Sequence, residues 1–450
     1  MPWTAGPAAL ATAPRVTFGG PARRAVIVVA GLAGLSAAHE LHRRGWDVVV
    51  LEASERIGGR VHTVRLGGQR AEAGGEYVDD VHVAIRTYAQ RFGIALEDTD
   101  LGTADGDDAV YLRRRRRRAR SVQTPEVRAE VARYDEAMDR LAADVEPADP
   151  TQAPGAAALD RRSVADLLDD LALHPTARFL VEQDTRDEYL VEPGQLSLLF
   201  HAAEWELPGT RAGAERYRLR GGNDQLPRAL AATLPTAALL CGNPVRAVAQ
   251  DGAGVRVTTA AARTVAGDGC VLAAPLPALR AIAYDPPLPD PLRAAIDQVQ
   301  YGVACKTLLQ YDARAWRTGG FSGDALSDLD ARTYWEATDG QPGRRGILLA
   351  YTAAEAGRAA AALSDRARIA EVARDAARLF PAVHGHLLRA ATSSCGYLAY
   401  APGQVLPFWR ALRDPIGRIV LAGEHTDTWA GDMNGAVRSG QRAASLLAEA

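Results

Sequence analysis

The chain has 450 residues, about three times the length of a typical domain, so two or three domains are expected. Hydrophobic residues make up 47% and charged residues 24% of it, which excludes a disordered or fibrous chain. The 52 basic and 55 acidic residues leave a net charge of -3, so no overall positive field attracts nucleic acid or an anionic membrane. We therefore expect a small-molecule partner.

The first residues and the cysteines indicate the compartment. Residues 1–23 lack the charged start and continuous apolar run of a secretory signal, so we expect a disordered tail. The longest apolar run, residues 26–38, is too short to cross a membrane. The four cysteines form no C-x-x-C pair, which argues against a disulfide framework and a metal site. We expect a cytoplasmic protein without bound metal.

Residues 25–51 predict a βαβ unit. The apolar runs 25–29 and 47–51 are rich in β-branched residues, as is typical of strands buried on both faces of a parallel sheet. Between them, apolar residues recur at helical spacing, and Gly45 ends the helix.

The glycines of this unit predict a dinucleotide site, with a purely structural βαβ unit as the alternative. Gly31 and Gly34 open the helix, whose amino terminus offers N–H groups and a positive dipole end to a pyrophosphate. Glu52 stands where an acid accepts hydrogen bonds from a ribose. Val29 replaces the first glycine of G-x-G-x-x-G, and we expect this β-branched residue to shift the loop and weaken nucleotide binding.

Two paired glycines follow the second strand. Gly58 and Gly59 precede Arg60, a forked donor suited to phosphate oxygens, and a second pair precedes Glu76 and Tyr77. Each pair permits close approach of the backbone, and an ordinary turn is the alternative reading.

The run of six arginines at 113–118 is the strongest charge cluster of the chain. Acidic residues precede it and no aromatic residues interrupt it, so a solvated hairpin or loop is favoured over a nucleic-acid site. Beyond it, a third glycine pair precedes a helix in 218–230, and strands are predicted in 244–258 and 264–274.

Lysine occurs only once, at position 306, within a predicted strand around 303–311. Such depletion is typical of a coding bias toward arginine, because most surface positions accept either cation. Lysine should persist at positions where arginine cannot do the same chemistry, since an ammonium group is compact and its pKa can be lowered until the group is neutral. Lys306 is a candidate functional residue, and a surface lysine is the alternative. Another strand around 345–352 and a helix over 365–379 follow.

At the carboxyl end, a strand over 418–422 leads through Gly423 and Glu424 to a helix that begins near Met433. Together with ERIGGR, GGEY, GGNDQL and YGVACKTLLQYDARAW, the final LAGEHTDTWAGDMNGAVRSG resembles the flavin-containing amine oxidases, the family of monoamine and polyamine oxidases and lysine-specific histone demethylases. The match spans residues 24–447 in outline and is weak between 93 and 210.

The resemblance implies an α/β fold with a Rossmann-like FAD-binding domain and a discontinuous α+β substrate domain. The expected FAD-binding segments are 24–80, 211–275 and 401–450, and the substrate-binding segments are 81–210 and 276–400. The residues that the resemblance assigns to FAD are Gly31, Leu32, Ala33, Gly34, Glu52, Ala53, Gly58, Gly59, Arg60, Gly74, Gly75, Glu76, Tyr77, Val245, Gly423, Glu424, Asp432, Met433 and Ala436.

The implied chemistry is oxidation of an amine C–N bond to an imine, followed by hydrolysis and by reoxidation of the flavin by O₂ to give H₂O₂. Lys306 falls on the family's lysine, which holds a water against flavin N5. Tyr397 matches one of two aromatics that flank the substrate, whereas Asp432 occupies the other's place and either caps the following helix or attracts an ammonium group. Lys306, Tyr397 and Asp432 are the candidate catalytic residues.

Two further departures bear on cofactor and substrate. Some members attach the flavin through a cysteine, but Gly396 holds that position, so noncovalent FAD is expected and Cys395 is predicted to be a buried thiol. Members that act on α-amino acids place an arginine where Tyr77 stands, so an amine without a carboxylate is favoured.

Two alternatives stay open: a dehydrogenase or desaturase of the same fold acting on a non-amine substrate, and a binding protein whose flavin site has decayed. The sequence also leaves open whether the chain works alone or as a homodimer.

Overall fold

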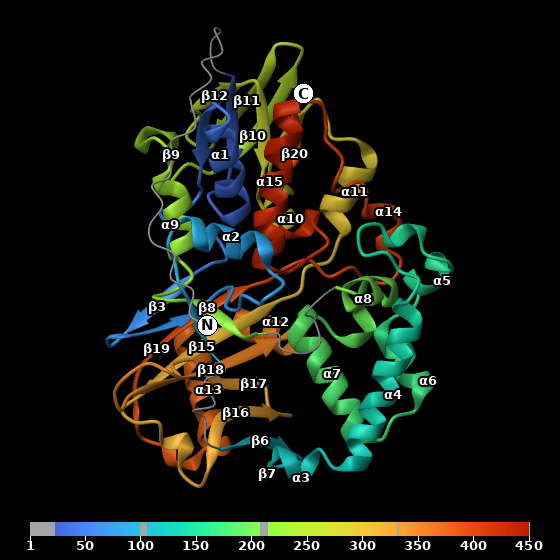
Figure 1. Cartoon of the computed structure of the whole chain (residues 1–450), viewed down its shortest axis with the longest axis vertical. Coiled ribbons are helices and arrows are strands. Elements are labelled where there is room, and N and C mark those ends of the chain that lie inside the picture. Colours follow the sequence, from blue (N-terminus) through green and yellow to red (C-terminus); the bar gives the residue numbers. More distant parts are fainter. Residues whose placement is uncertain (1–22, 100–105, 208–214, 331–332, 450) are drawn as a thin grey trace, which may run out of the picture.

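The structure is a computed structural model, and it describes residues 23–99, 106–207, 215–330 and 333–449. The predicted tail over 1–23 lies outside these residues except for Arg23. The nucleotide-type sheet, the mixed sheet that carries Lys306 and a group of helices form three neighbouring parts (Figure 1).

A five-stranded sheet carries the predicted βαβ unit. Its order is β20-β13-β1-β2-β9, and every neighbouring pair is parallel. The strands are β1 (Arg24–Val28), β2 (Asp47–Leu51), β9 (Leu239–Leu240), β13 (Gly269–Leu272) and β20 (Ile419–Leu421). Almost all of β1 is buried, as its β-branched composition predicts. The predictions of both strands and of the helix between them are confirmed.

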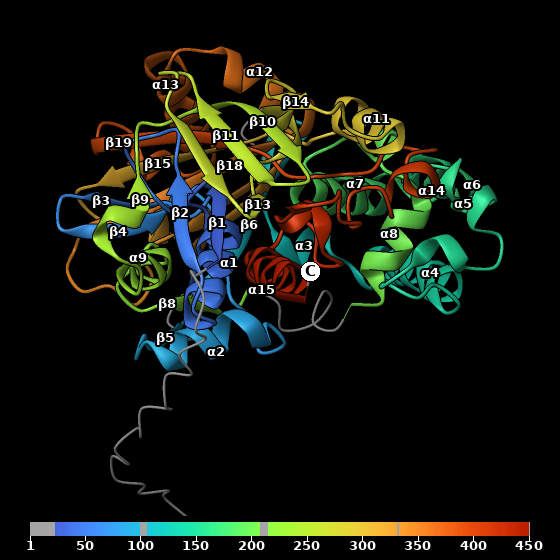
Figure 2. The same cartoon turned by 90° about the horizontal axis from the view of Figure 1, so that it is seen from above.

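The first and last helices of the described chain pack together on this sheet. They are α1 (Leu32–Arg43) and α15 (Met433–Glu449), and Figure 2 shows them side by side. A Cβ on Gly440 would lie 2.2 Å from the carbonyl oxygen of Ala33, so the helices approach closely only because residue 440 has no side chain. This contact joins the two ends of the chain around one site.

A smaller sheet has the order β12-β11-β10-β14. Its strands are β10 (Val245–Asp251), β11 (Gly254–Thr259), β12 (Thr264–Gly267) and β14 (Ala283–Asp285). Each of the strands predicted over 244–258 and 264–274 is therefore two strands, because short turns at 252–253 and 268 interrupt them. The domain boundaries stay a prediction; β14 lies in the segment assigned to substrate binding and pairs with β10.

The seven-stranded mixed sheet has the order β19-β15-β18-β17-β16-β6-β7. Its strands are β6 (Asp107–Leu112), β7 (Arg115–Arg118), β15 (Ala304–Tyr311), β16 (Phe321–Ser327), β17 (Thr333–Glu336), β18 (Gly346–Ala353) and β19 (Leu387–Cys395). The arginine run forms the turn and second strand of the β6–β7 hairpin, which confirms the hairpin prediction. The guanidinium carbons of Arg116 and Arg118 lie 4.7 and 5.1 Å from the centre of the Phe321 ring.

The remaining elements surround these sheets. The helices are α2 (Val83–Arg91), α3 (Ala119–Val122), α4 (Pro125–Ala142), α5 (Ala156–Asp160), α6 (Val164–Leu171), α7 (Pro175–Tyr189), α8 (Leu198–Trp205), α9 (Gln225–Ala232), α10 (Leu276–Leu279), α11 (Asp290–Gln298), α12 (Ala354–Ala362), α13 (Asp365–Leu379) and α14 (Val405–Phe408). The short strands β3 (Thr63–Leu66) and β4 (Gln69–Glu72) form one ribbon, and β5 (Leu96–Asp98) and β8 (Tyr217–Leu219) form another. Within the described ranges, no helix is long and apolar enough to cross a membrane.

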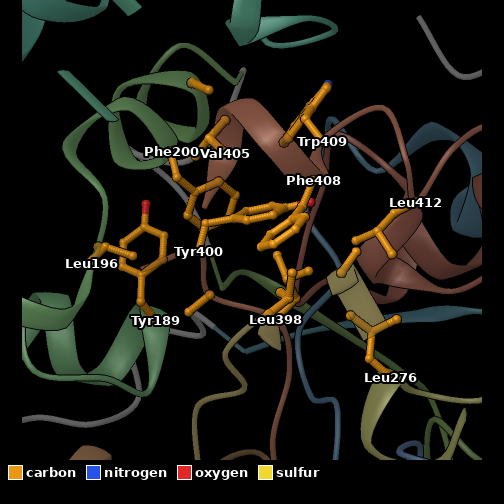
Figure 3. Close-up of a cluster of buried hydrophobic side chains, with 14 of the residues drawn as sticks. Tyr189, Leu196, Phe200, Leu276, Leu398, Tyr400, Val405, Phe408, Trp409 and Leu412 are labelled. Carbon is orange, nitrogen blue, oxygen red and sulfur yellow. The ribbon is translucent and has the colours of Figure 1, made fainter. Parts of the chain in front are cut away.

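Helix α7 is placed by its ends and by an aromatic cluster. Pro175 occupies its first turn, and it ends at Leu190, which takes a left-handed φ of 59°. Tyr189 packs edge-on against Phe200 of α8, which packs against Tyr400 in turn, as Figure 3 shows. Because all three rings are buried, α7 is held firmly beside the mixed sheet (Figure 1).

Candidate active site

A cavity of about 950 Å³ opens where the carboxyl ends of β1, β13 and β20 meet the mixed sheet. The sequence-predicted residues that line it are Gly31, Leu32, Ala33, Gly58, Gly59, Arg60, Gly74, Gly75, Glu76, Tyr77, Lys306, Tyr397, Gly423, Glu424, Asp432, Met433 and Ala436. Four others, Gly34, Glu52, Ala53 and Val245, do not line it. The tertiary structure thus gathers most of the predicted residues around one space.

The loop before α1 keeps a glycine-like shape although valine occupies it. Val29 has a φ of 84°, in the left-handed region that β-branched residues rarely adopt. Its N–H still donates to the carbonyl of Leu51 at 2.8 Å. The sequence predicted that valine would shift the loop; instead the residue takes the strained conformation, and the turn closes. Gly34 permits this closure, because a Cβ there would lie 2.0 Å from the Val29 carbonyl oxygen.

Replacing Val29 by glycine should give a more stable protein than replacing it by alanine, by about 1 kcal/mol. Both variants remove the branched side chain, and they differ only in a Cβ at a positive φ. Urea unfolding followed by circular dichroism measures the difference. Equal stability, or a more stable alanine variant, would show that residue 29 does not adopt a left-handed conformation.

The side chain of Glu52 accepts hydrogen bonds that hold the loop between β1 and α1 in place. Its side chain is 6% exposed and accepts from the N–H of Ala30 at 2.8 Å and from Ser54. The carbonyl of Glu52 accepts from Asn243, which precedes the start of β10 at Val245. The predicted ribose acid Glu52 and Val245, another residue that the resemblance assigns to FAD, are therefore neighbours, next to the end of the cavity at Gly31.

Lys306 belongs to a buried network of charges. Its ammonium lies 2.5 Å from a carboxylate oxygen of Glu76 and 3.1 Å from the carbonyl oxygen of Gly74. Arg218 donates to the other oxygen of Glu76 at 2.6 Å, and Trp335 donates to the same oxygen at 3.1 Å. Burial alone would raise the pKa of Glu76, but the charges of Lys306 and Arg218 outweigh it and hold this pKa below its usual value. The carboxyl of Glu76 is therefore ionised at neutral pH.

Asn223 and Arg218 are residues that sequence reasoning did not assign, although the motifs around them were recognised. The side-chain amide of Asn223 donates to the carbonyls of Gly75 and Glu76, at 3.0 and 2.6 Å. Its position directly after a glycine pair, before a helix, was the available signal. Both residues hold the GGEY segment, residues 74–77, in place.

Arg60 and Glu424 form a second buried pair. Arg60 donates to Glu424 at 2.7 Å and to the carbonyl of Gly396 at 3.0 Å. Glu424 also accepts from the N–H of Gly431 at 2.9 Å. Its burial would raise its pKa, and the guanidinium of Arg60 lowers it below the usual value instead. The arginine predicted for phosphate oxygens thus also fixes Glu424, an acid that the resemblance assigns to FAD.

The candidate substrate side combines Tyr397, Asp432 and an unpredicted histidine. Tyr397 lines the cavity and donates to the backbone carbonyl of Glu188 at 2.6 Å. Asp432 accepts from the N–H of Asn434 at the start of α15, as the capping interpretation requires. Its other oxygen lies 3.5 Å from Nε2 of His82, which no sequence pattern had singled out.

Cys395 is a correction to the sequence analysis, because its thiol is only half-buried and lines the cavity. It ends β19, where the strand meets the cavity wall rather than the core. All four cysteines are free.

Helix α7 adds carboxylates that sequence reasoning missed. Asp184, Asp187 and Glu188 all line the cavity. Burial and the neighbouring carboxylates raise the pKa of Glu188 to about 8, and burial raises that of Asp187 to about 7. In the sequence they resemble an ordinary solvated helix face, so no local signal distinguished them. Within the described ranges, no cluster of side chains has the geometry of a metal site.

The stability of the protein should fall as the pH rises from about 6.5 to 8. In this range the folded chain keeps protons on these carboxyls that the unfolded chain has already released. These carboxyls stabilise the folded chain fully at a pH below the pKa that they have in the unfolded chain. The stabilisation is lost as the pH rises through the higher pKa that they have in the folded chain. Buried histidines such as His201, whose pKa burial lowers to about 3, oppose this trend only below about pH 6.5, the ordinary histidine pKa. Melting temperatures at several pH values measure the slope, which Glu188→Gln should flatten; a rising slope would contradict the assignment.

Comparison with known proteins identifies the class. The family model of flavin-containing amine oxidoreductases matches residues 32–448. AofH of Mycobacterium tuberculosis, provisionally named a flavin-containing monoamine oxidase, is 32% identical over 94% of this chain and 96% of its own. The L-amino acid dehydrogenase of Synechocystis is 29% identical, with 94% of each chain covered. Cyclohexylamine oxidase from Brevibacterium oxydans superposes with a TM-score of 0.85 at 25% identity, covering 95% of this chain and 99% of that one.

The chain belongs to the flavin-containing amine oxidoreductase family. It is a flavoprotein oxidoreductase with the α/β fold of that family, and its cofactor is FAD. The cavity suits a dinucleotide, because α1 points its amino terminus into it and Gly31 and Gly59 leave room that a side chain would take. A Cβ on Gly59 would lie 3.3 Å from the Cα of Gly31, so the two backbones pack without side chains between them.

Proposed function

We propose that the protein oxidises the C–N bond of an amine that lacks an α-carboxylate. The amine loses two electrons and two protons to become an imine, which water hydrolyses to an aldehyde or ketone and ammonia or a smaller amine. FAD, when bound, accepts the two electrons, and O₂ then takes them to form H₂O₂.

The charge of the cavity is the observation that carries this proposal. Among the described residues, the lysine and the arginine that line it are already paired, Lys306 with Glu76 and Arg60 with Glu424, and the ring of His82 lies 3.5 Å from Asp432. Additional carboxylates on α7 face the same space. Among the described residues, an α-carboxylate would therefore find no unpaired guanidinium to clamp it, whereas the carboxyl oxygens on α7 can accept hydrogen bonds from an amine.

The roles of the protein's own groups follow from their positions. Lys306, held by Glu76 and by Gly74, presents a fixed ammonium to the cavity and is proposed to orient a water beside the flavin. Tyr397 is proposed to flank the substrate, because its ring faces the cavity while its hydroxyl is tied to α7. The surrounding buried side chains exclude bulk water, which would hydrate the reacting amine.

We also propose that FAD is held noncovalently. A Cβ on Gly396, the position of the attaching cysteine in some relatives, would lie 1.9 Å from the carbonyl oxygen of Gly302. The backbone therefore excludes a side chain there. Cys395, one residue earlier, is the last residue of β19.

The purified protein tests the function directly. We expect a yellow protein with a flavin spectrum, bleached without oxygen by some members of an amine panel and not by L-amino acids. Acid precipitation should release all of the FAD into the supernatant. Bleaching by amino acids would contradict the proposal that the substrate lacks an α-carboxylate. Bleaching only by a non-amine would favour a desaturase. A protein that stays colourless with added FAD would favour a binding protein whose flavin site has decayed.

A further inference from the structure

Asp432 lies between the two residues that the proposed reaction uses. Gly431, directly before it, packs on the ring of Tyr397, since a Cβ on Gly431 would lie 2.7 Å from that ring. Met433, directly after it, contacts the GGEY segment, where a Cβ on the second glycine would lie 2.9 Å from the Met433 sulfur. The same segment holds the ammonium of Lys306. Asp432 therefore lines the cavity beside the place proposed for the reacting amine.

The two oxygens of Asp432 have different surroundings. Oδ1 accepts from the N–H of Asn434 and so caps α15. Oδ2 lies 3.5 Å from Nε2 of His82. A quarter of the side chain is exposed, so a ligand in the cavity can reach the carboxylate. The residue can therefore keep its structural contact through one oxygen while the other takes part in chemistry.

His82 is fixed with Nε2 toward this carboxylate. The N–H of Asp79 donates to Nδ1 of His82 at 2.9 Å, so Nδ1 carries a lone pair and the proton of the ring is on Nε2. The ring packs edge-on against Trp429, with 5.0 Å between the ring centres, and only 7% of the side chain is exposed. The gap to Asp432 is about half an ångström longer than a hydrogen bond, so a small movement of the carboxylate closes it.

The charges around Asp432 favour uptake of a proton. Burial is the largest influence on the pKa of Asp432 and raises it, and the carboxylate of Asp79 raises it further. His82 and the N–H groups at the start of α15 lower this pKa, but it stays above its ordinary value. Glu188 of α7 and Glu204 of α8 also face Asp432; burial raises the pKa of each, and the charge of Asp432 adds to that rise. A carboxylate in such surroundings is a stronger base than an exposed one.

An alkylamine reaches the site as an ammonium ion at neutral pH, because its pKa is about 10, and its nitrogen needs a free electron pair before the C–N bond can be oxidised. We propose that Asp432 is the catalytic base that takes one proton from this ammonium group, and that His82 is a positioning residue that holds Asp432 for this step. An N–H bond of the substrate breaks, its electron pair stays on the nitrogen, and an O–H bond forms on Asp432. The proton passes to water when the product leaves. This inference rests on the proposed amine oxidation and adds the step that precedes it.

The pH dependence of kcat/KM for pentylamine tests the base in the FAD-loaded protein. Asp432→Asn keeps an oxygen that can cap α15 and removes the charge. In the wild type kcat/KM should vary by less than about threefold between about pH 8 and 9.5, because the abundant ammonium form is the one used. The variant depends on the rare neutral amine, so its kcat/KM should be about a hundredfold lower at about pH 8 and rise about tenfold per pH unit. The control Asp80→Asn removes a carboxylate that is 58% exposed nearby and should keep the wild-type profile.

Two kinetic results would overturn the proposal while amine oxidation stands. One is a deficit of Asp432→Asn that has the same size at every pH, which a merely structural role would give. The other is a wild-type profile that itself rises tenfold per pH unit, since the protein would then select the neutral amine from solution. If neither protein oxidises any amine, the proposed function is refuted instead.

Infrared difference spectra supply a readout that needs no turnover. tert-Butylamine has no α-hydrogen and cannot be oxidised to an imine. Its binding to the FAD-loaded wild type should produce the C=O band of a protonated carboxyl, and its binding to Asp432→Asn should not. The absence of this band in the wild type, or its presence in both proteins, would show that Asp432 does not take the proton.

Two variants of His82 test its positioning role. His82→Phe keeps a ring against Trp429 and removes the Nε2 donor, so the acid limb of the kcat/KM profile should move to higher pH by about one unit, because the N–H that favours the charged carboxylate is lost. The amide of His82→Gln can present an N–H near the place of Nε2, and its acid limb should stay close to that of the wild type. An unmoved limb in His82→Phe would remove His82 from the mechanism.

Discussion

Replacing Lys306 by methionine should slow turnover of an amine by about a hundredfold to a thousandfold, in flavin reduction, in reoxidation by oxygen or in both. The substitution keeps a side chain of similar length and removes the ammonium group that points into the cavity. Lys306 is 12% exposed and is fixed by two contacts, so its charge is already in place before any substrate arrives. Stopped-flow absorbance separates the two half-reactions. Rates within about twofold of wild type would remove Lys306 from the mechanism.

The Lys306→Met variant also leaves the carboxylate of Glu76 without its lysine partner, and this second effect needs its own control. The double variant Lys306→Met/Glu76→Gln removes both charges of the pair and leaves Arg218 beside a neutral amide. If the ammonium itself matters, the double variant should be as slow as the single one. Recovery in the double variant would instead show that the stranded carboxylate caused the loss. The FAD content of each preparation, read from its spectrum, excludes simple loss of cofactor.

Replacing Glu424 by alanine should lower the free energy of unfolding by about 3 kcal/mol and deplete bound FAD. The carboxylate is 3% exposed and satisfies Arg60 and the N–H of Gly431. Its removal leaves a guanidinium and a backbone donor in the cavity wall without their acceptor, beside the strand end at Gly423. Denaturant unfolding and the ratio of flavin to protein absorbance measure the two effects.

An exposed ion pair provides the comparison. Asp297→Ala breaks the pair of Arg293 and Asp297, whose side chains are 44% and 39% exposed. That change should cost no more than about 0.5 kcal/mol, because water screens both charges. If Glu424→Ala costs equally little, the buried pair with Arg60 does not support the site.

Much of the fold was predictable because its causes are local. The strand at 24–28 and the helix at 32–43 follow from hydrophobic periodicity, and the arginine run was expected in a solvated hairpin or loop, where it forms part of the β6–β7 hairpin. The depletion of lysine indicated Lys306 without any structural information, since it depends on composition alone. The interpretation of Asp432 as a helix cap also needed only its neighbours.

The partners of these residues were decided by tertiary structure. Lys306 and Glu76 are 230 positions apart, and Arg60 and Glu424 are 364 apart, so no periodicity in the sequence connects them. The acids of α7 show the same limit, because an inward and an outward carboxylate have the same local pattern until packing turns one face toward the cavity. By itself the sequence determined the βαβ unit, because short-range sterics and hydrophobic spacing set it, while the motifs indicated the family and the composition indicated the candidate lysine. Only the folded chain decided which charges are paired, because pairing depends on distances across the core.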